Sequence, residues 1–278
     1  MSTIATETPS VTDPDFAAAW GRWHADHERR RADGHGFLAI TSIRWLTSEP
    51  ERFPDVPGAW STSEDGPVVT LAKGEQLEID GAAVTGIHRF GPLPERTSVN
   101  ASWATGDRTA VVEVARRGGN DIIRPRHPDA EILAAYTGTD AYAPDDRFVV
   151  EAAYTPFDEP REVTVGSVVD GLQHVYEAPG LLSFDLDGPR ELVAFDGHDG
   201  GLTVLFTDLT SGVTTYAANR SVAVEAPDEH GRVLIDFNRA VNLPCAYTPY
   251  ATCPLPPAEN RLAVAIEAGE KKPSGADS

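Results

Sequence analysis

The chain has 278 residues, and 41% of them are hydrophobic, which is enough to bury a substantial core. Its 43 acidic residues outnumber its 23 basic residues and give a net charge of −20. A surface this acidic repels a phosphate backbone, so we expect no nucleic-acid partner. No apolar stretch approaches the ~20 residues of a membrane-spanning helix, so we expect no membrane partner either.

The N-terminal residues lack the basic and apolar regions of a secretory signal. We therefore expect a disordered leader over 1–12 and a cytoplasmic location. An amphipathic helix should follow, because Asp13 can cap it, Pro14 suits its first turn and aromatic side chains recur at helical spacing. The recurring side chains are Phe16, Trp20, Trp23 and His27. We interpret this face as a docking surface for the rest of the protein.

After Gly36, apolar and polar residues alternate with a period of two, and Gly, Pro or Asp separates the runs. The expected strands lie at 37–46, 68–74, 75–81, 82–90, 109–117, 146–157, 162–169, 181–188, 191–197, 202–209, 221–227, 231–238 and 262–268. Asp80-Gly81 and Asp187-Gly188 fit tight hairpins, and a short helix is expected at 128–136. So many strands without intervening helices predict a mainly β (α+β) fold, an antiparallel barrel or sandwich that could be split-barrel-like.

We expect one composite β-rich domain over 13–271, followed by a disordered tail over 272–278. Proline and charge cluster at 156–160, which marks a candidate sub-boundary within this domain.

The most informative stretch is 234–271, where polar and aromatic residues lie between two expected apolar strands. Five prolines interrupt it: Pro244, Pro249, Pro254, Pro256 and Pro257. Proline fixes φ and removes a backbone donor, so the segment between the strands can be neither helix nor central sheet. We predict a rigid, extended loop over 244–257, ordered and mostly buried against the second half of the chain.

The sequence DFNRAVNLPCAYTPYATCPLPP followed by ENRLAVAIEAGEK, at 236–271, resembles the signature of DUF1684, a bacterial and archaeal family of unknown function. Further matching runs lie at 206–220, 122–129 and 36–46. The resemblance therefore spans most of the chain, from about Phe16 to Lys271. The resemblance implies a family but no chemistry. Any reaction has to be inferred from the residues themselves.

Both cysteines, Cys245 and Cys253, lie in the proline-rich loop. A disulfide is not the default in a reducing cytosol, so we expect buried structural thiols. A disulfide is the next alternative, followed by a catalytic thiol or a metal ligand. A nearby arginine could lower the pKa of a Cys245 nucleophile. His24 and His27 have helical spacing that suits a metal, but no third ligand is near in sequence, so we predict no metal site.

The candidate binding residues are polar or cationic side chains close to the loop. Tyr216 and Arg220 would share one face of a strand and could grip an anion between them. Asp236 and Asn238 would share the face of another strand, opposite Arg239. The other candidate ligand-binding residues are Tyr247, Asn260 and Arg261, and the candidate catalytic residues are Asp236, Cys245 and Glu259.

These features favour a protein that binds a small, anionic organic ligand or cofactor at the proline-rich loop. A flavin-dependent oxidoreductase that uses FMN is the leading enzymatic version, by analogy of fold alone. A hydrolase that uses Asp236 or Glu259, or Cys245 as nucleophile, is an alternative. A non-catalytic structural or interaction protein is a third, and a homodimer is compatible with each of them.

Overall fold

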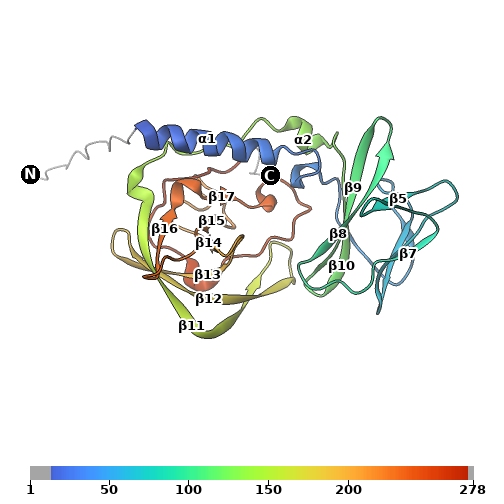
Figure 1. Ribbon diagram of the computed structural model, residues 1–278. Helices are drawn as coiled ribbons and strands as arrows, with labels where there is room; N and C mark the ends of the chain where they lie inside the picture. The colour runs from blue at the N-terminus through green and yellow to red at the C-terminus, as the bar shows by residue number, and fades with distance from the viewer. Residues whose placement is uncertain (1–13, 275–278) are drawn as a thin grey trace, which may run out of the picture.

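The computed structural model describes residues 14–274 and shows a mainly β protein built from antiparallel sheets (Figure 1). Two β units lie side by side, a small unit (44–126) and a large unit (149–242), and the first helix runs along the large unit. The expected leader, the Asp13 cap and residues 275–278 of the expected tail lie outside the described residues. The tail residue Lys272 is described, and its amide donates to the carbonyl of Thr214.

Most of the elements are strands, and the helices and 3₁₀ turns lie before, between and after them. The helices are α1 (Pro14–Arg31) and α2 (Glu131–Ala135), and the 3₁₀ turns are η1 (Phe37–Ala39), η2 (Asp146–Phe148), η3 (Phe237–Arg239), η4 (Pro244–Ala246) and η5 (Ala258–Asn260). The strands are β1 (Arg44–Trp45), β2 (Glu51–Arg52), β3 (Ala59–Ser63), β4 (Gly66–Thr70), β5 (Leu77–Ile79), β6 (Ala82–Val84), β7 (Ile87–Arg89), β8 (Ser98–Thr105), β9 (Arg108–Arg117), β10 (Asn120–Arg126), β11 (Val149–Gly166), β12 (Gln173–Asp185), β13 (Pro189–Asp196), β14 (Leu202–Phe206), β15 (Arg220–Val224), β16 (Arg232–Asp236) and β17 (Val241–Asn242).

The small unit packs two antiparallel sheets around one core. The sheets have the orders β1-β10-β9-β8-β5-β6 and β2-β3-β4-β7. Alternating apolar residues from both sheets meet inside, around the fully buried Trp60. The β5–β6 hairpin closes through Asp80-Gly81, both at positive φ, as the tight turn requires.

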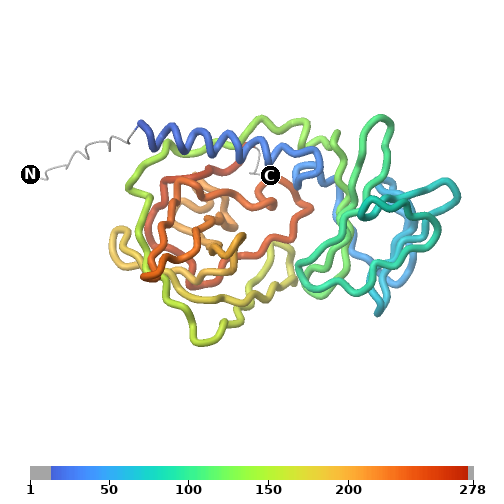
Figure 2. The backbone as a smooth tube through the Cα atoms, in the orientation of Figure 1, coloured from blue at the N-terminus to red at the C-terminus, as the bar shows by residue number. Residues whose placement is uncertain are grey.

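The large unit is one seven-stranded sheet with the order β16-β11-β12-β13-β14-β15-β17. The sheet curls until β15 contacts β16, which closes most of a barrel. Its apolar interior is completed by residues 262–268, which bury Leu262, Val264, Ile266 and Ala268 among the strands. Figure 2 shows the end of the chain (red) returning along this unit, near the first helix (blue).

The strand expected at 262–268 is wrong, although its alternation does mark which side chains are buried. Its backbone bonds to the neighbouring chain at Leu262–Thr207 and Leu209–Val264 without forming a strand, and side chains supply further hydrogen bonds. The Arg220 guanidinium donates to the carbonyls of Ile266 and Ala268, and the amide of Ile266 donates to the Asp208 carboxylate. Gly269 then turns the chain at a φ of 73°, where a Cβ would lie 2.5 Å from the carbonyl oxygen of Ala240.

Other expectations are corrected in detail. The strand expected at 37–46 begins as η1 and pairs only at Ile40 and over β1. The helix expected at 128–136 exists but covers only α2. Residues 156–160 lie inside β11, where the register with β12 shifts.

Asn260 fastens two strands of the large unit. β13 and β14 pair directly only at Phe195–Thr203 and Asp196–Leu202. Further along, the side chain of Asn260 spans them: it accepts from the amide of Val193 and donates to the carbonyls of Val193 and Leu205, at 2.7 to 2.9 Å. A fully buried amide with three such bonds is a structural element of the sheet.

We therefore expect Asn260→Ala to lower the free energy of unfolding by about 2–4 kcal/mol, because it leaves buried backbone groups of both strands without partners. Urea denaturation measures the change. Glu259→Ala, at the exposed neighbouring position, is the matched control and should change stability little. Equal effects of the two substitutions would contradict this role for Asn260.

Candidate functional site

A pocket of about 600 Å³ lies beside the proline-rich loop. It brings together η1, the α2 segment, the loop and residues from two more distant segments. Its lining residues are Leu38, Ile132, Ala135, Tyr136, Thr137, Gly138, Tyr216, Cys245, Ala246, Tyr247, Thr248, Pro249, Pro273 and Ser274. We call it the Cys245 pocket, after the thiol-bearing residue in its wall.

Cys245 sits on the short 3₁₀ turn η4, which Pro244 starts. Its amide donates to the sulfur of Cys253 at 3.3 Å, and its carbonyl accepts from the hydroxyl of Tyr216 at 2.9 Å. A hydrogen bond from Cys253 lowers the pKa of the Cys245 thiol, with help from Tyr216, although burial opposes the shift. The same hydrogen bond, together with burial, raises the pKa of Cys253. Both cysteines are free thiols.

Tyr247 and Tyr136 form an aromatic wall of the pocket. Their rings meet edge to face with centroids 6.1 Å apart, and Phe37 contacts Tyr247 from another side at 5.5 Å. Burial raises the pKa of Tyr136 to about 12 and raises that of Tyr247 further. Both phenols therefore stay neutral near pH 7, so they offer hydrogen bonds and apolar surface without charge.

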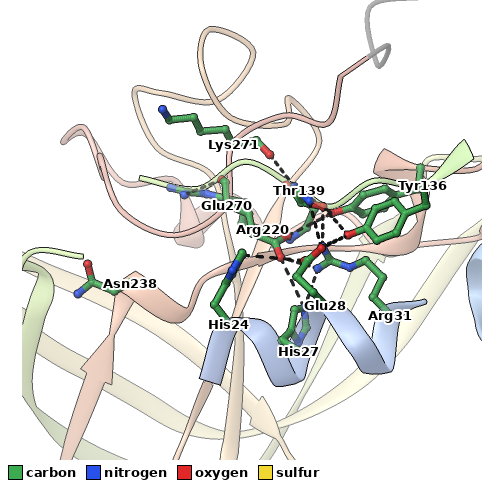
Figure 3. A network of polar contacts seen from close by, with 12 residues as sticks. His24, His27, Glu28, Arg31, Tyr136, Thr139, Arg220, Asn238, Glu270 and Lys271 are labelled. Carbon is green, nitrogen blue, oxygen red and sulfur yellow. Dashed lines mark hydrogen bonds and ion pairs between the residues drawn. The ribbon is translucent and has the colours of Figure 1, made fainter. Parts of the chain in front are cut away.

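A buried polar network behind this wall fixes the two tyrosines (Figure 3). Arg31, near the end of α1, donates to Glu270 at 2.5 Å and to Glu28 at 2.9 Å, and both its side chain and that of Glu270 are almost fully buried. The Tyr136 hydroxyl donates to Glu28 at 2.5 Å, and the Tyr247 hydroxyl donates to Glu270 at 3.3 Å. The guanidinium also lies 4.8 Å from the centroid of the Tyr247 ring.

The charges in this network explain its pKa shifts. Burial is the largest single influence and would lower the pKa of Arg31, but Glu270, Tyr247 and Tyr136 together outweigh it and raise that pKa. Burial raises the pKa of Glu270, with Arg31 opposing. Arg31 has only donors, so the Nε2 of His27, 2.6 Å away, accepts and His27 is neutral. Burial and then Arg31 accordingly lower the pKa of His27 to about 4.

His24, Glu28 and Glu270 each offer a ligand atom within 4.8 Å of the others, a spacing that a metal could use. The carboxylate oxygens that such an ion would need are held by Arg31, through Glu28 Oε1 and Glu270 Oε1. A guanidinium there supplies the positive charge that a metal would bring. The arrangement therefore fits a structural cluster with its own cation.

Three of the residues expected at a site line one cavity: Tyr216, Cys245 and Tyr247. The proline-rich loop that carries two of them is largely buried against the ends of β11 and β12, as expected. Leu255 and Cys253 bond through their backbones to Gly166 and Val168, and the His174 ring bonds to the carbonyl of Thr252.

A second group of expected site residues lies away from the pocket, under α1. Asp236 ends β16 and caps η3, where it accepts from the amide and side chain of Asn238. Asn238 therefore lies on a turn, and the expectation that it follows Asp236 along a strand face is wrong. Its carbonyl accepts from Trp20 of α1 at 2.7 Å. Arg239 pairs with Asp236 at 3.2 Å and covers the ring of Trp23.

Arg220 is also separate from the pocket. Tyr216 precedes β15 and two bends intervene, so the expectation that the two share a strand face is wrong. The Arg220 guanidinium is buried, pairs with Asp208 at 2.8 Å and stacks on Phe206. Burial lowers its pKa, with Asp208 opposing.

The remaining candidates lie on and beside η5. Asn260 joins β13 to β14, whereas Glu259 is exposed and reaches Arg161 only at 3.5 Å. Arg261 is exposed and bridges to Thr207 through its backbone. None of the three lines the Cys245 pocket.

Sequence reasoning missed Arg31, Glu28, Tyr136 and Glu270 as parts of the site. Glu270 stands in the matching run at 259–271 directly before two lysines, but the exposed Glu267 three positions earlier left no signal for which of the two acids is buried. Arg31 and Glu28 looked like an ordinary solvated helix end. Only the fold shows that this end of α1 is covered by both the 136–139 segment and the chain's last residues.

A larger hollow of about 1200 Å³ lies in the small unit, beside Asp55, Trp103 and His127. Some of its polar groups bind one another, since Arg52 pairs with Glu75 and the His127 ring bonds to the carbonyl of Asp55, whereas Asp55 Oδ1 has no hydrogen-bond partner among the described residues. It contains neither cysteine. We therefore place the candidate site at the Cys245 pocket, where a thiol and three phenols converge.

Residues 134–271 match the model of a family described as "Protein of unknown function (DUF1684)". The chain belongs to this family. The matched segment includes Tyr136, Tyr216, Cys245 and Tyr247, and thus all the phenols of the pocket and its thiol.

One solved structure similar to the chain is the solution NMR structure of an uncharacterized protein of Haloarcula marismortui. It is 32% identical, with a TM-score of 0.42, and the match covers 50% of this chain and 78% of that one. No curated protein matches the chain. Within residues 14–274, no helix is long and apolar enough to cross a membrane.

The buried pair of Arg220 and Asp208 gives a direct prediction of stability. Arg220→Met should lower the free energy of unfolding by about 3–5 kcal/mol, because it leaves the buried Asp208 carboxylate without its cation and the carbonyls of Ile266 and Ala268 without their guanidinium donor. Urea denaturation measures it. Adding Asp208→Asn should recover part of the loss. Arg232→Met, which breaks an exposed pair with Asp228, is the matched control and should have a much smaller effect.

His27 gives a pH prediction. Its pKa falls from 6.5 to about 4 on folding, so the unfolded chain takes up this proton first and stability declines as pH falls through that window. His27→Gln can still accept from Arg31 but does not titrate, so its stability should decline less between pH 6.5 and 4. Thermal unfolding across that range tests this. Parallel curves for the two proteins would contradict a neutral, buried His27.

Proposed function

We propose that the protein binds a small, uncharged organic molecule in the Cys245 pocket. The observation that carries this is the convergence of Tyr136, Tyr216, Tyr247 and Cys245, from three separated segments, on a cavity of about 600 Å³. That volume lies within the ~300–1,000 Å³ of ordinary ligand pockets. Apolar walls with a few fixed polar groups are their usual composition, and this lining has both.

The charge of the pocket lining limits which class of ligand it can bind. Among the described residues, the lining holds no lysine or arginine. Arg31 lies behind Tyr247 and is bound by two carboxylates, and Arg220 is bound by Asp208 in the core of the large unit. The anion expected from the sequence therefore lacks a cation here, as does the phosphate of FMN. The proposal accordingly keeps the small organic ligand and drops both its negative charge and the flavin.

A catalytic role would fall to Cys245. Of the three expected catalytic residues, only Cys245 lines the pocket. Asp236 is occupied with capping η3 and with Arg239, and Glu259 is exposed. The carboxylate version of a hydrolase has no support at this site. Chemistry at the Cys245 thiol is supported, because its lowered pKa favours the nucleophilic thiolate.

Two neighbouring alanines of α2 allow a matched test of binding. Ala135 lines the pocket and Ala134 does not, while both are exposed on the same short helix. In Ala135→Trp an indole should fill the cavity. We expect uncharged aromatic fragments, screened by ligand-observed NMR, to bind the wild type and Ala134→Trp, and to lose at least ~10-fold in affinity for Ala135→Trp.

Melting curves would confirm that both variants fold. Fragments that bind all three proteins equally would place binding elsewhere, and a preference for anionic fragments would contradict the neutral pocket.

A further inference from the structure

We propose that Cys245 and Cys253 form a redox-active dithiol that reduces a small, uncharged disulfide bound in the Cys245 pocket. The proposal rests on the proposed binding function and adds the class of substrate and the reaction. Cys245 is the attacking thiol in the wall of the pocket, and Cys253 is the resolving thiol behind it.

The two sulfurs are positioned for exchange. Cys253 Sγ accepts from the backbone nitrogen of Cys245 at 3.3 Å. A backbone nitrogen is ~1.5 Å from its own Cα, so this sulfur lies within ~5 Å of the Cys245 Cα. In a disulfide the second sulfur is three bonds from the first residue's Cα, so a Cys253 sulfur this close to the Cys245 Cα is near the position that a bond to the Cys245 sulfur requires. A bond between the two sulfurs therefore needs only side-chain rotation and small shifts of the loop.

The surroundings assign different roles to the two thiols. Cys245 is half-buried and lines the pocket, so a ligand bound there lies beside this residue. Cys253 is only 6% exposed, so a ligand reaches it only after Cys245 has reacted. The hydrogen bond from Cys253 lowers the pKa of Cys245 and raises that of Cys253, so Cys245 is the thiol more readily present as the attacking thiolate.

The loop holds Cys253 firmly in that position. Its carbonyl accepts from the amide of Val168 and from the hydroxyl of Ser167. On either side, the carbonyl of Thr252 bonds to His174, and that of Pro254 accepts from Asn219. Prolines follow at 254, 256 and 257. A bland surface loop would not need this many fixed contacts around one buried thiol.

The reaction balances as thiol–disulfide exchange. The Cys245 thiolate attacks one sulfur of the bound disulfide, whose S–S bond breaks, and the leaving thiolate takes up the proton that Cys245 lost. Cys253 then loses its proton and attacks the Cys245 sulfur, releasing the second half of the substrate as a thiol. The substrate gains two electrons and two protons, and the protein becomes an internal disulfide. A low-molecular-mass thiol in the cell would reduce it again.

The probe for this reaction is 2,2′-dithiodipyridine, an uncharged aromatic disulfide that releases a coloured thione at each step. The native protein should release two thiones per chain and lose two hydrogens by intact mass, without keeping an adduct. Its rate should saturate with probe concentration, and dithiothreitol should restore the starting mass. Oxidised glutathione, which is charged, should react at least ~10-fold more slowly, since the lining has no cation to hold it.

Two serine variants separate the thiols. Cys253→Ser should release one thione and keep one pyridyl adduct, since the resolving thiol is gone. Cys245→Ser should react at least ~100-fold more slowly than the wild type, because the remaining thiol is buried. A stable adduct on the wild type, or rapid reaction of Cys245→Ser, would overturn the proposal. Melting curves identify any variant that does not fold, and the wild-type stoichiometry is decisive without the variants.

Failure of this proposal is distinguishable from failure of the binding proposal. Fragment binding that Ala135→Trp abolishes, together with a stable pyridyl adduct on the wild type, would leave the pocket intact and remove only the dithiol chemistry. Two thiones released at equal, non-saturating rates by wild type and Ala135→Trp would show a reactive thiol pair that uses no pocket, which contradicts reduction of a bound substrate.

Discussion

The ion pair between Arg31 and Glu270 is the interaction on which the arrangement of the site depends. It joins the end of the first helix to the end of the described chain, and both side chains are almost completely buried. Removing Arg31 would leave the Glu270 carboxylate buried without a cation, and removing Glu270 would leave Arg31 with Glu28 as its carboxylate partner. The pair also fixes Tyr247, because Glu270 accepts from its hydroxyl while Arg31 stacks on its ring. One wall of the pocket is thus set by contacts made 239 positions apart.

A second buried ion pair, between Arg220 and Asp208, lies deeper in the large unit. There the guanidinium replaces a missing strand by binding the carbonyls of Ile266 and Ala268. Asn260 does the same between β13 and β14. Arg220 and Asn260, which the sequence offered as ligand-binding residues, thus form hydrogen bonds with backbone groups. These contacts hold residues 262–268 inside the large unit, and the residues that follow bring Glu270 to Arg31. The pocket lies beside that ion pair.

Local patterns predicted α1, most of the strands and the Asp80-Gly81 hairpin, but they missed β8 and the first part of β12. They failed at 262–268, since alternation reports burial but not whether a neighbouring strand is available. The sequence also pointed to Tyr216, Cys245 and Tyr247, which do share a pocket. It could not separate them from Arg220, because polar residues at strand ends serve ligands and buried backbone groups equally well. The partnership of Arg31 with Glu270 is a product of the fold and leaves no local signal.

The central claim is that this scaffold presents Cys245 as a reactive thiol at the wall of a neutral pocket. The most direct measurement is the ultraviolet absorbance of its thiolate as a function of pH, taken as the difference between the wild type and Cys245→Ser. The account predicts a midpoint below the ordinary thiol value of about 8.5, moving upward in Cys253→Ala, where no side-chain donor remains to hydrogen-bond the Cys245 sulfur. A midpoint at or above the ordinary value in the wild type would contradict it.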